Sequence, residues 1–179
     1  MVLGLEPGVV RLLAYQEEWR QLFAEEKARL QAALGETVLD IQHVGSTSVP
    51  GLPAKPIIDI GIAVGNYEAA TVCINPIEQL GYTYLGENGI PRRHYFRKGE
   101  PRTHHIHMNE MRSVAWENQV LFRDYLLRHP EAVEAYAKLK ITLVRQFPAD
   151  RDAYTLRKAP LITQILDLAR EERSKRPGQ

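Results

Sequence analysis

The sequence predicts an α+β fold in which a mixed sheet is combined with an N-terminal helix and a C-terminal layer of helices. Apolar residues recur at helical spacing before residue 35, follow strand-like patterns between residues 37 and 110, and return to helical spacing from about residue 113. A run of strands closed by a run of helices is typical of this fold class. At 179 residues, the chain suits one domain over residues 1–179, with its core from about 15 to about 169.

The first helix is predicted to end at Leu34, because Gly35 is the residue type that most often follows a helix C-terminus. Its apolar residues fall near i, i+4, i+7 and i+8, and charged residues occupy the other side. These apolar residues are Tyr15, Trp19, Leu22, Phe23, Leu30, Ala33 and Leu34. Residues 37–44 then alternate as a half-buried strand does.

The middle of the chain is predicted to hold the rest of the sheet. Residues 45–56 contain two glycines and three prolines, which indicates an ordered loop. Residues 57–64 are nearly all apolar and are expected to form a buried central strand. The next elements are a helix over 67–80 and strands over 82–85, 94–98 and 103–110. Pro76 should kink or restart the helix in which it lies.

The last third of the chain is predicted to be helical. The expected helices cover residues 116–128, 131–147 and 151–172, and the last should be interrupted near Pro160. The polar segment 170–179 is expected to be a frayed end. Four basic residues of these helices are expected to face solvent, namely Arg123, Lys138, Lys140 and Lys158.

The composition of the chain excludes several functional classes of protein. The net charge of +1 gives no general attraction to nucleic acid or to an acidic membrane, so nucleic-acid binding is disfavoured. The single cysteine, Cys73, cannot form an internal disulfide, which suits a reducing compartment. No apolar segment is long enough for a membrane span, and the N-terminus has no signal-peptide pattern. We therefore expect a cytoplasmic protein without membrane contact, and leave open whether its helices pair with a second copy.

A Gly-Ser turn and an acidic residue on the following strand form the first candidate site. Gly45 and Ser46 end one predicted strand, and Asp59 lies within the next. Polymerase-β-like nucleotidyltransferases use this arrangement: the turn offers backbone N–H groups and a hydroxyl to a triphosphate. The carboxylate on the next strand holds a divalent metal, Mg²⁺ or Mn²⁺, against the phosphates. The motif predicts a nucleotidyltransferase-like, polymerase-β-type sheet that binds a nucleoside triphosphate.

Alternation along the 57–64 strand places Asp59 on the face opposite the isoleucines. Asp59 and Gly61 share one face, whose small residues leave room for a ligand. A carboxylate buried in a sheet is costly unless it is paired or binds a metal, so the alternatives are an ion pair with Lys55 or an arginine, or an exposed strand end. Nucleotidyltransferases carry a second acid two residues further on. Gly61 stands there, which leaves the usual two-metal site incomplete and the catalytic activity in doubt.

His105 and His107 alternate with the apolar residues Ile106 and Met108 in the 103–110 strand. If this strand neighbours the one that carries Asp59, both histidines face the carboxylate. Two imidazoles and one carboxylate can hold a divalent metal. The histidines could instead bind phosphate, act as acid and base near neutral pH, or simply satisfy polar groups on the sheet.

A basic cluster precedes this strand. It comprises Arg92, Arg93, His94, Arg97, Lys98 and Arg102. Such a cluster suits phosphate or carboxylate binding, or charge protection of an edge strand. We select Arg93 and Arg102, together with Lys55 from the loop, as candidates for neutralising phosphate.

Residues 43–60 closely resemble the signature of the GrpB family, as do the segments 89–93, 103–108 and 121–126. The resemblance extends from about Tyr15 to about Ala169. It implies the nucleotidyltransferase superfamily, whose GrpB members occur alone or fused to dephospho-CoA kinase. It does not name a substrate.

Two functions follow as expectations. The first is a metal-dependent nucleotidyl transfer from a nucleoside triphosphate to a small acceptor. Asp59, His105 and His107 would hold the metal or polarise the acceptor. The second is a non-catalytic domain that binds a nucleotide or a CoA-like ligand and regulates a partner, which the glycine at position 61 favours.

Overall fold

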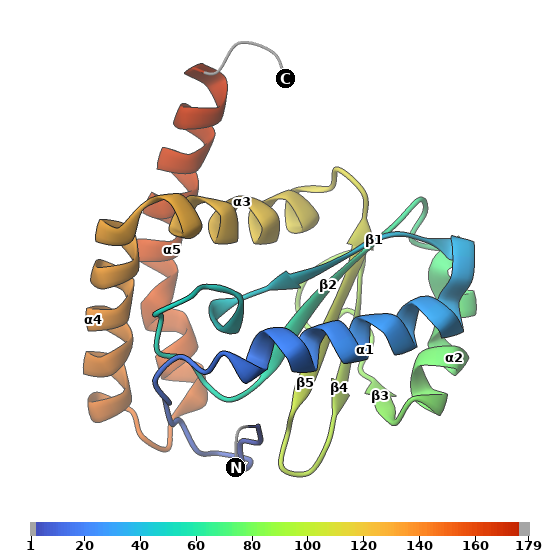
Figure 1. Ribbon diagram of the computed structural model, residues 1–179, viewed down its shortest axis with the longest axis horizontal. Coiled ribbons are helices and arrows are strands. Elements are labelled where there is room, and N and C mark those ends of the chain that lie inside the picture. The colour runs from blue at the N-terminus through green and yellow to red at the C-terminus, as the bar shows by residue number, and fades with distance from the viewer. Residues whose placement is uncertain (1–2, 176–179) are drawn as a thin grey trace.

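The computed structural model describes residues 3–175, and its described elements follow the predicted order closely (Figure 1). The α-helices are α1 (Glu18–Leu34), α2 (Ile74–Gln79), α3 (Val114–Arg128), α4 (Pro130–Gln146) and α5 (Arg151–Lys175). The strands are β1 (Val38–Val44), β2 (Ile58–Val64), β3 (Tyr82–Tyr84), β4 (Arg93–Lys98) and β5 (His104–Glu110). Short 3₁₀ turns cover Gly35–Thr37, Ser46–Ser48 and Ala69–Cys73.

The five strands form one mixed sheet in the order β1-β2-β5-β4-β3. Strands β2 and β5 are parallel neighbours at its centre, and the other pairs are antiparallel. In the β2–β5 register, Asp59 lies beside His105 and Gly61 lies beside His107. The mixed sheet with an N-terminal helix and a C-terminal helical layer is thus confirmed.

One face of the sheet is the hydrophobic core. Ile58, Ile60 and Ile62 point to this face together with Ile106 and Met108, and all are fully buried. Helices α1 and α2 cover this face and contact each other. Because side chains alternate along a strand, Asp59, His105 and His107 are directed to the opposite face, as the sequence predicted.

The C-terminal helices lie beyond that opposite face. Helix α3 crosses over one end of the sheet, and α4 and α5 stand beside it (Figure 1). A second apolar cluster joins these helices to the loop that follows β1. Its buried members are Val49, Leu52, Tyr125, Leu126, Tyr136, Ile165 and Ala169. The helical layer therefore fixes the loop that carries the Gly-Ser turn.

Two predictions for the C-terminal region were wrong. Helix α5 continues through Pro160 without a break. The proline cannot donate a hydrogen bond to the carbonyl of Leu156, and its ring clashes with that carbonyl. Because both residues are exposed, water can hydrogen-bond to the carbonyl instead. Residues 170–175 are not frayed but continue α5, because Arg170 and Arg173 bind Asn118 and Glu117 of α3. Residues 176–179 of the predicted tail lie outside the described residues.

The predicted helix over 67–80 is divided. A 3₁₀ turn over Ala69–Cys73 leads into α2, which begins at Ile74 and places Pro76 in its first turn. Proline is tolerated there because the first N–H groups of a helix have no intrahelical partner. Among the described residues, no helix combines the length and apolar character that a membrane span requires.

Candidate functional site

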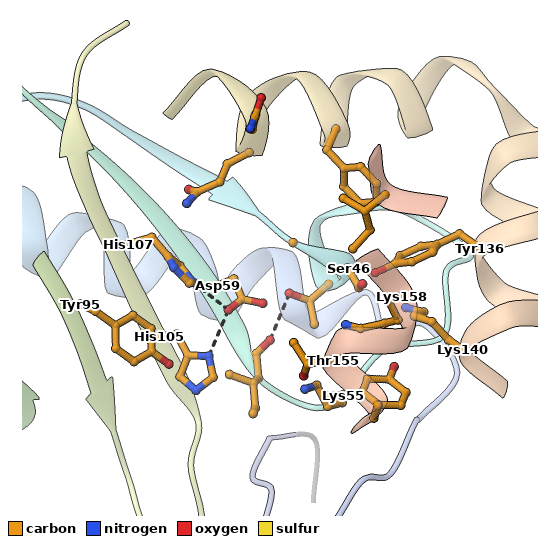
Figure 2. Close-up of a pocket in the computed structure, with 18 of the residues that line it drawn as sticks. Ser46, Lys55, Asp59, Tyr95, His105, His107, Tyr136, Lys140, Thr155 and Lys158 are labelled. Atoms are coloured by element: carbon orange, nitrogen blue, oxygen red, sulfur yellow. Dashed lines mark hydrogen bonds and ion pairs between the residues drawn. The ribbon is translucent and has the colours of Figure 1, made fainter. Parts of the chain in front are cut away.

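A cavity of about 490 Å³ lies between the second face of the sheet, the Gly-Ser turn and helices α3, α4 and α5. Seven of the eight predicted site residues line it: Gly45, Ser46, Lys55, Asp59, Arg93, His105 and His107. Figure 2 shows the Asp–His group on one side of the cavity and three lysine side chains on the other. The fold thus brings together predicted site residues that lie as far as 62 positions apart in the sequence, from Gly45 to His107.

Asp59 accepts hydrogen bonds from both histidines at one carboxylate oxygen. Oδ1 lies 3.1 Å from Nδ1 of His105 and 3.2 Å from Nε2 of His107. The parallel β2–β5 register explains this geometry, because it sets the two histidines beside consecutive positions of one strand face. Burial raises the pKa of Asp59, but the hydrogen bonds that the two histidines donate outweigh it and hold the pKa well below its ordinary value.

This Asp–His group has the composition of a metal site. One donor atom from each of Asp59, His105 and His107 lies within 4.8 Å of the others. Mg²⁺ prefers oxygen ligands, whereas imidazole nitrogen is a ligand of transition metals. The mixed donor set therefore fits a transition metal better than Mg²⁺.

Gly45 brings the backbone of the Gly-Ser turn against the carboxylate. Its φ is +69° and its ψ is −171°, a conformation that is essentially restricted to glycine. A Cβ atom at this position would lie 2.6 Å from Oδ2 of Asp59. The next residue, Ser46, lines the cavity with Tyr136 of α4, and Val49 and Leu52 further along the loop pack against the helices. The turn is therefore fixed on one side by Asp59 and on the other by the helical layer.

We predict that Gly45→Ala destabilises the fold and weakens ligand binding together. The backbone strain alone costs about 1–3 kcal/mol, and the methyl group must also displace Asp59. Gly51→Ala is the matched control, since Gly51 also has a positive φ of +77° but open space around its Cβ. Urea denaturation and Mn²⁺ titration of both variants separate the two effects. Equal loss of metal affinity in both variants would contradict the assignment.

Helix α3 fills the space beside Gly61, where nucleotidyltransferases carry their second acid. A Cβ on Gly61 would lie 3.2 Å from Oε1 of Gln119 and 3.3 Å from the ring of Trp116. An aspartate there would require these side chains to shift by at least a few tenths of an ångström. His107, the register neighbour of Gly61, is the polar group that reaches Asp59 from this side. Packing against α3 therefore disfavours a second carboxylate at this position.

The two predicted arginines have different surroundings. Arg93 lines the cavity, but its guanidinium donates to the backbone carbonyls of Glu87 and Asn88 and to Nδ1 of His107. Arg102 is not among the residues that line the cavity. The N-terminal segment covers it, since Leu5 pairs with its backbone and the Glu6 carbonyl accepts from its guanidinium. The structure therefore does not bring Arg102 to the candidate site.

Lys140 and Lys158 line the cavity, so the prediction that they face solvent was wrong. The Nζ of Lys140 is buried and has no hydrogen-bond partner among the described residues. It lies 4.9 Å from the ring centroid of Tyr136. Lys158 and Lys55 lie 4.7 and 5.2 Å from the ring centroid of Tyr154.

The prediction failed for these lysines because it placed every charged residue of the two helices on the solvent side, whatever its position along the helix. A signal was present in the spacing. Tyr136, Lys140 and Leu143 lie at i, i+4 and i+7, so Lys140 shares the apolar face of α4. Arg123 is also largely buried, with 14% of its side chain exposed, whereas Lys138 is exposed as predicted.

The lysine side of the cavity carries an excess of positive charge. Burial, followed by repulsion from neighbouring cations, lowers the pKa of Lys55 to about 8. Burial lowers the pKa of Lys158 to about 8 as well, and holds that of Lys140 well below its ordinary value. Asp59 is the one acidic residue among those that line the cavity, against Lys55, Arg93, Lys140, Arg151 and Lys158. Such a cavity suits a multiply charged anion.

The chain is similar in sequence to several known proteins. The sequence profile of the GrpB protein family matches residues 9–168. The UPF0157 protein YqkA of Bacillus subtilis is 45% identical over 146 residues, which cover 81% of this chain and 43% of that protein. A dephospho-CoA kinase of Mycolicibacterium paratuberculosis is 31% identical over 84% of this chain and 44% of its own length. The chain thus spans less than half of each of these two relatives.

A solved structure matches over nearly the whole chain. The crystal structure of the conserved protein GrpB from Enterococcus faecalis superimposes with a TM-score of 0.86 at 35% sequence identity. The match covers 92% of this chain and 100% of the other. The sheet, the N-terminal helix and the C-terminal helical layer are therefore a shared architecture.

Proposed function

This chain belongs to the GrpB protein family, and we propose that it is a metal-dependent transferase that passes a nucleotidyl group from a nucleoside triphosphate to a small acceptor. One observation carries the proposal. The Asp–His group, whose donor atoms could bind a metal, and three lysines face each other across a single cavity. A metal-bound polyphosphate has the two features that these opposite sides would recognise.

The proposed roles follow from position in the cavity. The Asp–His group would hold the metal through Asp59 and its histidine neighbourhood, and the metal would neutralise charge on the phosphates. The backbone and hydroxyl of the Gly45–Ser46 turn bind phosphate oxygens next to it. Lys55, Lys140 and Lys158 hold the distal phosphates.

The proposed reaction replaces a phosphoanhydride bond of the triphosphate with a phosphoester bond to the acceptor. An acceptor hydroxyl oxygen forms a bond to the α-phosphorus, and the bond from that phosphorus to the bridging oxygen of the β-phosphate breaks. Pyrophosphate leaves, and the proton of the acceptor passes to solvent. The contribution of the chain is to align the triphosphate and to place positive charge where the leaving pyrophosphate gains negative charge.

A second function is favoured by the single carboxylate of the cavity. Two-metal transferases hold their ions with more than one acid, and packing against α3 disfavours a second acid at Gly61. A domain that binds a nucleotide or a CoA-like ligand without turnover would need only the anion site. Its role would be to regulate or position a partner enzyme.

Pyrophosphate release separates the two functions. The wild type would be incubated with Mn²⁺, each nucleoside triphosphate in turn, and a panel of small hydroxyl and amine acceptors. Transfer predicts release that depends on both metal and acceptor, and mass spectrometry of the acceptor should show an added nucleotidyl group. Tight binding of a triphosphate with no release across the panel would favour the binding function and count against the transferase.

Triphosphate binding is predicted to weaken as pH rises through about 8, the pKa of Lys55 and Lys158. An anion binds the protonated lysines, so above this pH binding must take up protons, and affinity should fall by up to about tenfold per pH unit for each proton gained. Calorimetry from about pH 7 to about pH 9.5 avoids titration of the phosphates, whose second pKa is about 6. Affinity that is flat across this range would contradict the lysine assignment.

The ligand-free protein should respond to pH in the opposite sense. The lysines are neutralised at about pH 8 in the folded state but near their ordinary pKa of 10.5 in the unfolded state. Between these values the unfolded state binds more protons, so the free energy of unfolding should rise with pH. Thermal melting without ligand at about pH 8 and about pH 10 checks the sign.

A further inference from the structure

We infer that Arg93 fixes the tautomer of His107, so that His107 positions the Asp59 carboxylate by a hydrogen bond and is not itself a metal ligand. The inference deepens the proposed function and rests on it, because it states which residues of the Asp–His group would hold the metal. Asp59 and His105 remain as the protein ligands.

The Arg93 guanidinium is held rigidly. Arg93 is buried at the start of β4. Its Nε and Nη2 atoms donate to the Glu87 carbonyl at 3.2 and 3.1 Å, and Nη2 also donates to the Asn88 carbonyl at 2.8 Å. Its carbon Cζ lies 4.7 Å from the ring centroid of Tyr95. The remaining nitrogen, Nη1, therefore has a fixed direction.

That nitrogen faces the imidazole of His107. Nη1 of Arg93 lies 3.3 Å from Nδ1 of His107. A guanidinium has only N–H donors and no acceptor, so Nδ1 must offer a lone pair. The imidazole then carries its proton on Nε2, which lies 3.2 Å from Oδ1 of Asp59 and donates to it. The contacts form a directed chain from Arg93 through His107 to Asp59.

This chain conflicts with coordination through Nε2. A histidine that binds a metal by Nε2 carries its proton on Nδ1 and usually donates it to a carboxylate or carbonyl. Here Nδ1 of His107 would meet another donor, Arg93. His105 has no such constraint, since its second nitrogen, Nε2, has no hydrogen-bond partner among the described residues. The proton of His105 can therefore move to Nε2, which leaves the lone pair of Nδ1 for a metal.

The consequence is a metal site with two protein ligands. The other coordination positions are then left for phosphate oxygens and water, which is the usual arrangement where a metal is bound together with substrate phosphates. The metal would therefore arrive with the triphosphate more readily than it binds alone. Arg93, which we selected from the sequence as a phosphate ligand, acts instead through His107.

The test reads the histidine ring nitrogens directly. The wild type would be labelled with ¹⁵N-histidine, and ring ¹⁵N shifts would be recorded without metal and during titration with Zn²⁺ alone. His105→Asn and His107→Gln assign the signals and retain an N–H donor toward Asp59. We expect His107 to be protonated on Nε2 and unprotonated on Nδ1 in both states, while Nδ1 of His105 shifts on zinc binding. Zinc affinity should change by less than about threefold in His107→Gln and fall about 100-fold or more in His105→Asn.

The outcomes are distinguishable. A proton on Nδ1 of His107, with or without zinc, would overturn the inference, as would equal loss of zinc affinity in the two variants. If neither histidine responds to zinc, the metal-dependent function fails, while the metal-free tautomer of His107 still decides whether Arg93 directs it. Arg93→Lys keeps a donor and a positive charge and serves as the second variant. Retention of the Nε2–H tautomer in Arg93→Lys supports the chain.

Discussion

The Lys140→Met variant should be more stable than the wild type and bind triphosphate more weakly. The ammonium of Lys140 is buried without a hydrogen-bond partner among the described residues, a situation that costs about 1–3 kcal/mol. Methionine has a similar length and no charge to desolvate, so the melting temperature should rise by roughly 2–4 °C for each kcal/mol recovered. Thermal melting without ligand measures this rise.

The same change removes a charged donor from the proposed phosphate site. Hydrogen bonds to charged groups contribute about 1.5–3 kcal/mol, so triphosphate affinity should fall by roughly tenfold to 100-fold. Replacing a residue that serves function at the expense of stability should raise the stability and lower the binding affinity together. Isothermal titration with a non-hydrolysable triphosphate analogue and Mn²⁺ measures the loss.

Lys138→Met is the matched control. Lys138 lies on the same helix but is exposed, and it pairs with Glu134 on the helix surface. Its replacement should leave both the melting temperature and the triphosphate affinity nearly unchanged. If Lys140→Met binds triphosphate as well as the wild type, the lysine side of the cavity is not the phosphate site.

Asp59→Asn should abolish metal-dependent binding while the chain still folds. The asparagine carbonyl can accept the hydrogen bonds from His105 and His107, so the local packing is preserved. The negative charge and one metal-binding oxygen are lost. Loss of outer-shell partners alone lowers metal affinity about 10–100-fold, and removal of a direct ligand should cost about 100-fold or more.

Mn²⁺ titration in the presence of the triphosphate analogue checks this expectation, and circular dichroism checks the fold. Asp40→Asn on the neighbouring strand β1 is the control, because Asp40 is the same residue type but does not line the cavity. Metal affinity that is lost in Asp59→Asn and kept in Asp40→Asn supports the site. Unchanged Mn²⁺ binding in Asp59→Asn would remove Asp59 from the metal site.

The elements of the fold could be predicted because their periodicities are local. The alternation in Ile58–Val64 and His104–Glu110 assigned a core face and an opposite face, and the structure bears out both. Apolar spacing likewise placed α1, α3, α4 and α5 to within a few residues, whereas the helix predicted over 67–80 is α-helical only over Ile74–Gln79. Pro160 was misassigned because its exposure depends on how α5 packs, which no local pattern contains.

The candidate site was predictable only in part. The Gly-Ser turn and Asp59 lie close enough in sequence to form a motif, but the pairing of β2 with β5 joins positions 46 residues apart. Lys140 and Lys158 were not predicted as site residues, because they lie among apolar core positions on their helices. The roles of Arg93 and His107 depend on one interatomic contact, Nη1 to Nδ1, and so required the structure.

The most direct test of the account is the thermodynamic coupling between metal and triphosphate in the wild type. Calorimetry would measure the affinity of a non-hydrolysable triphosphate analogue with and without Mn²⁺, and that of Mn²⁺ with and without the analogue. A shared site predicts that each raises the affinity of the other by the same factor, within the range of about 5–150-fold that such couplings show. Equal affinities with and without the second ligand would contradict a cavity that binds a metal and a triphosphate together.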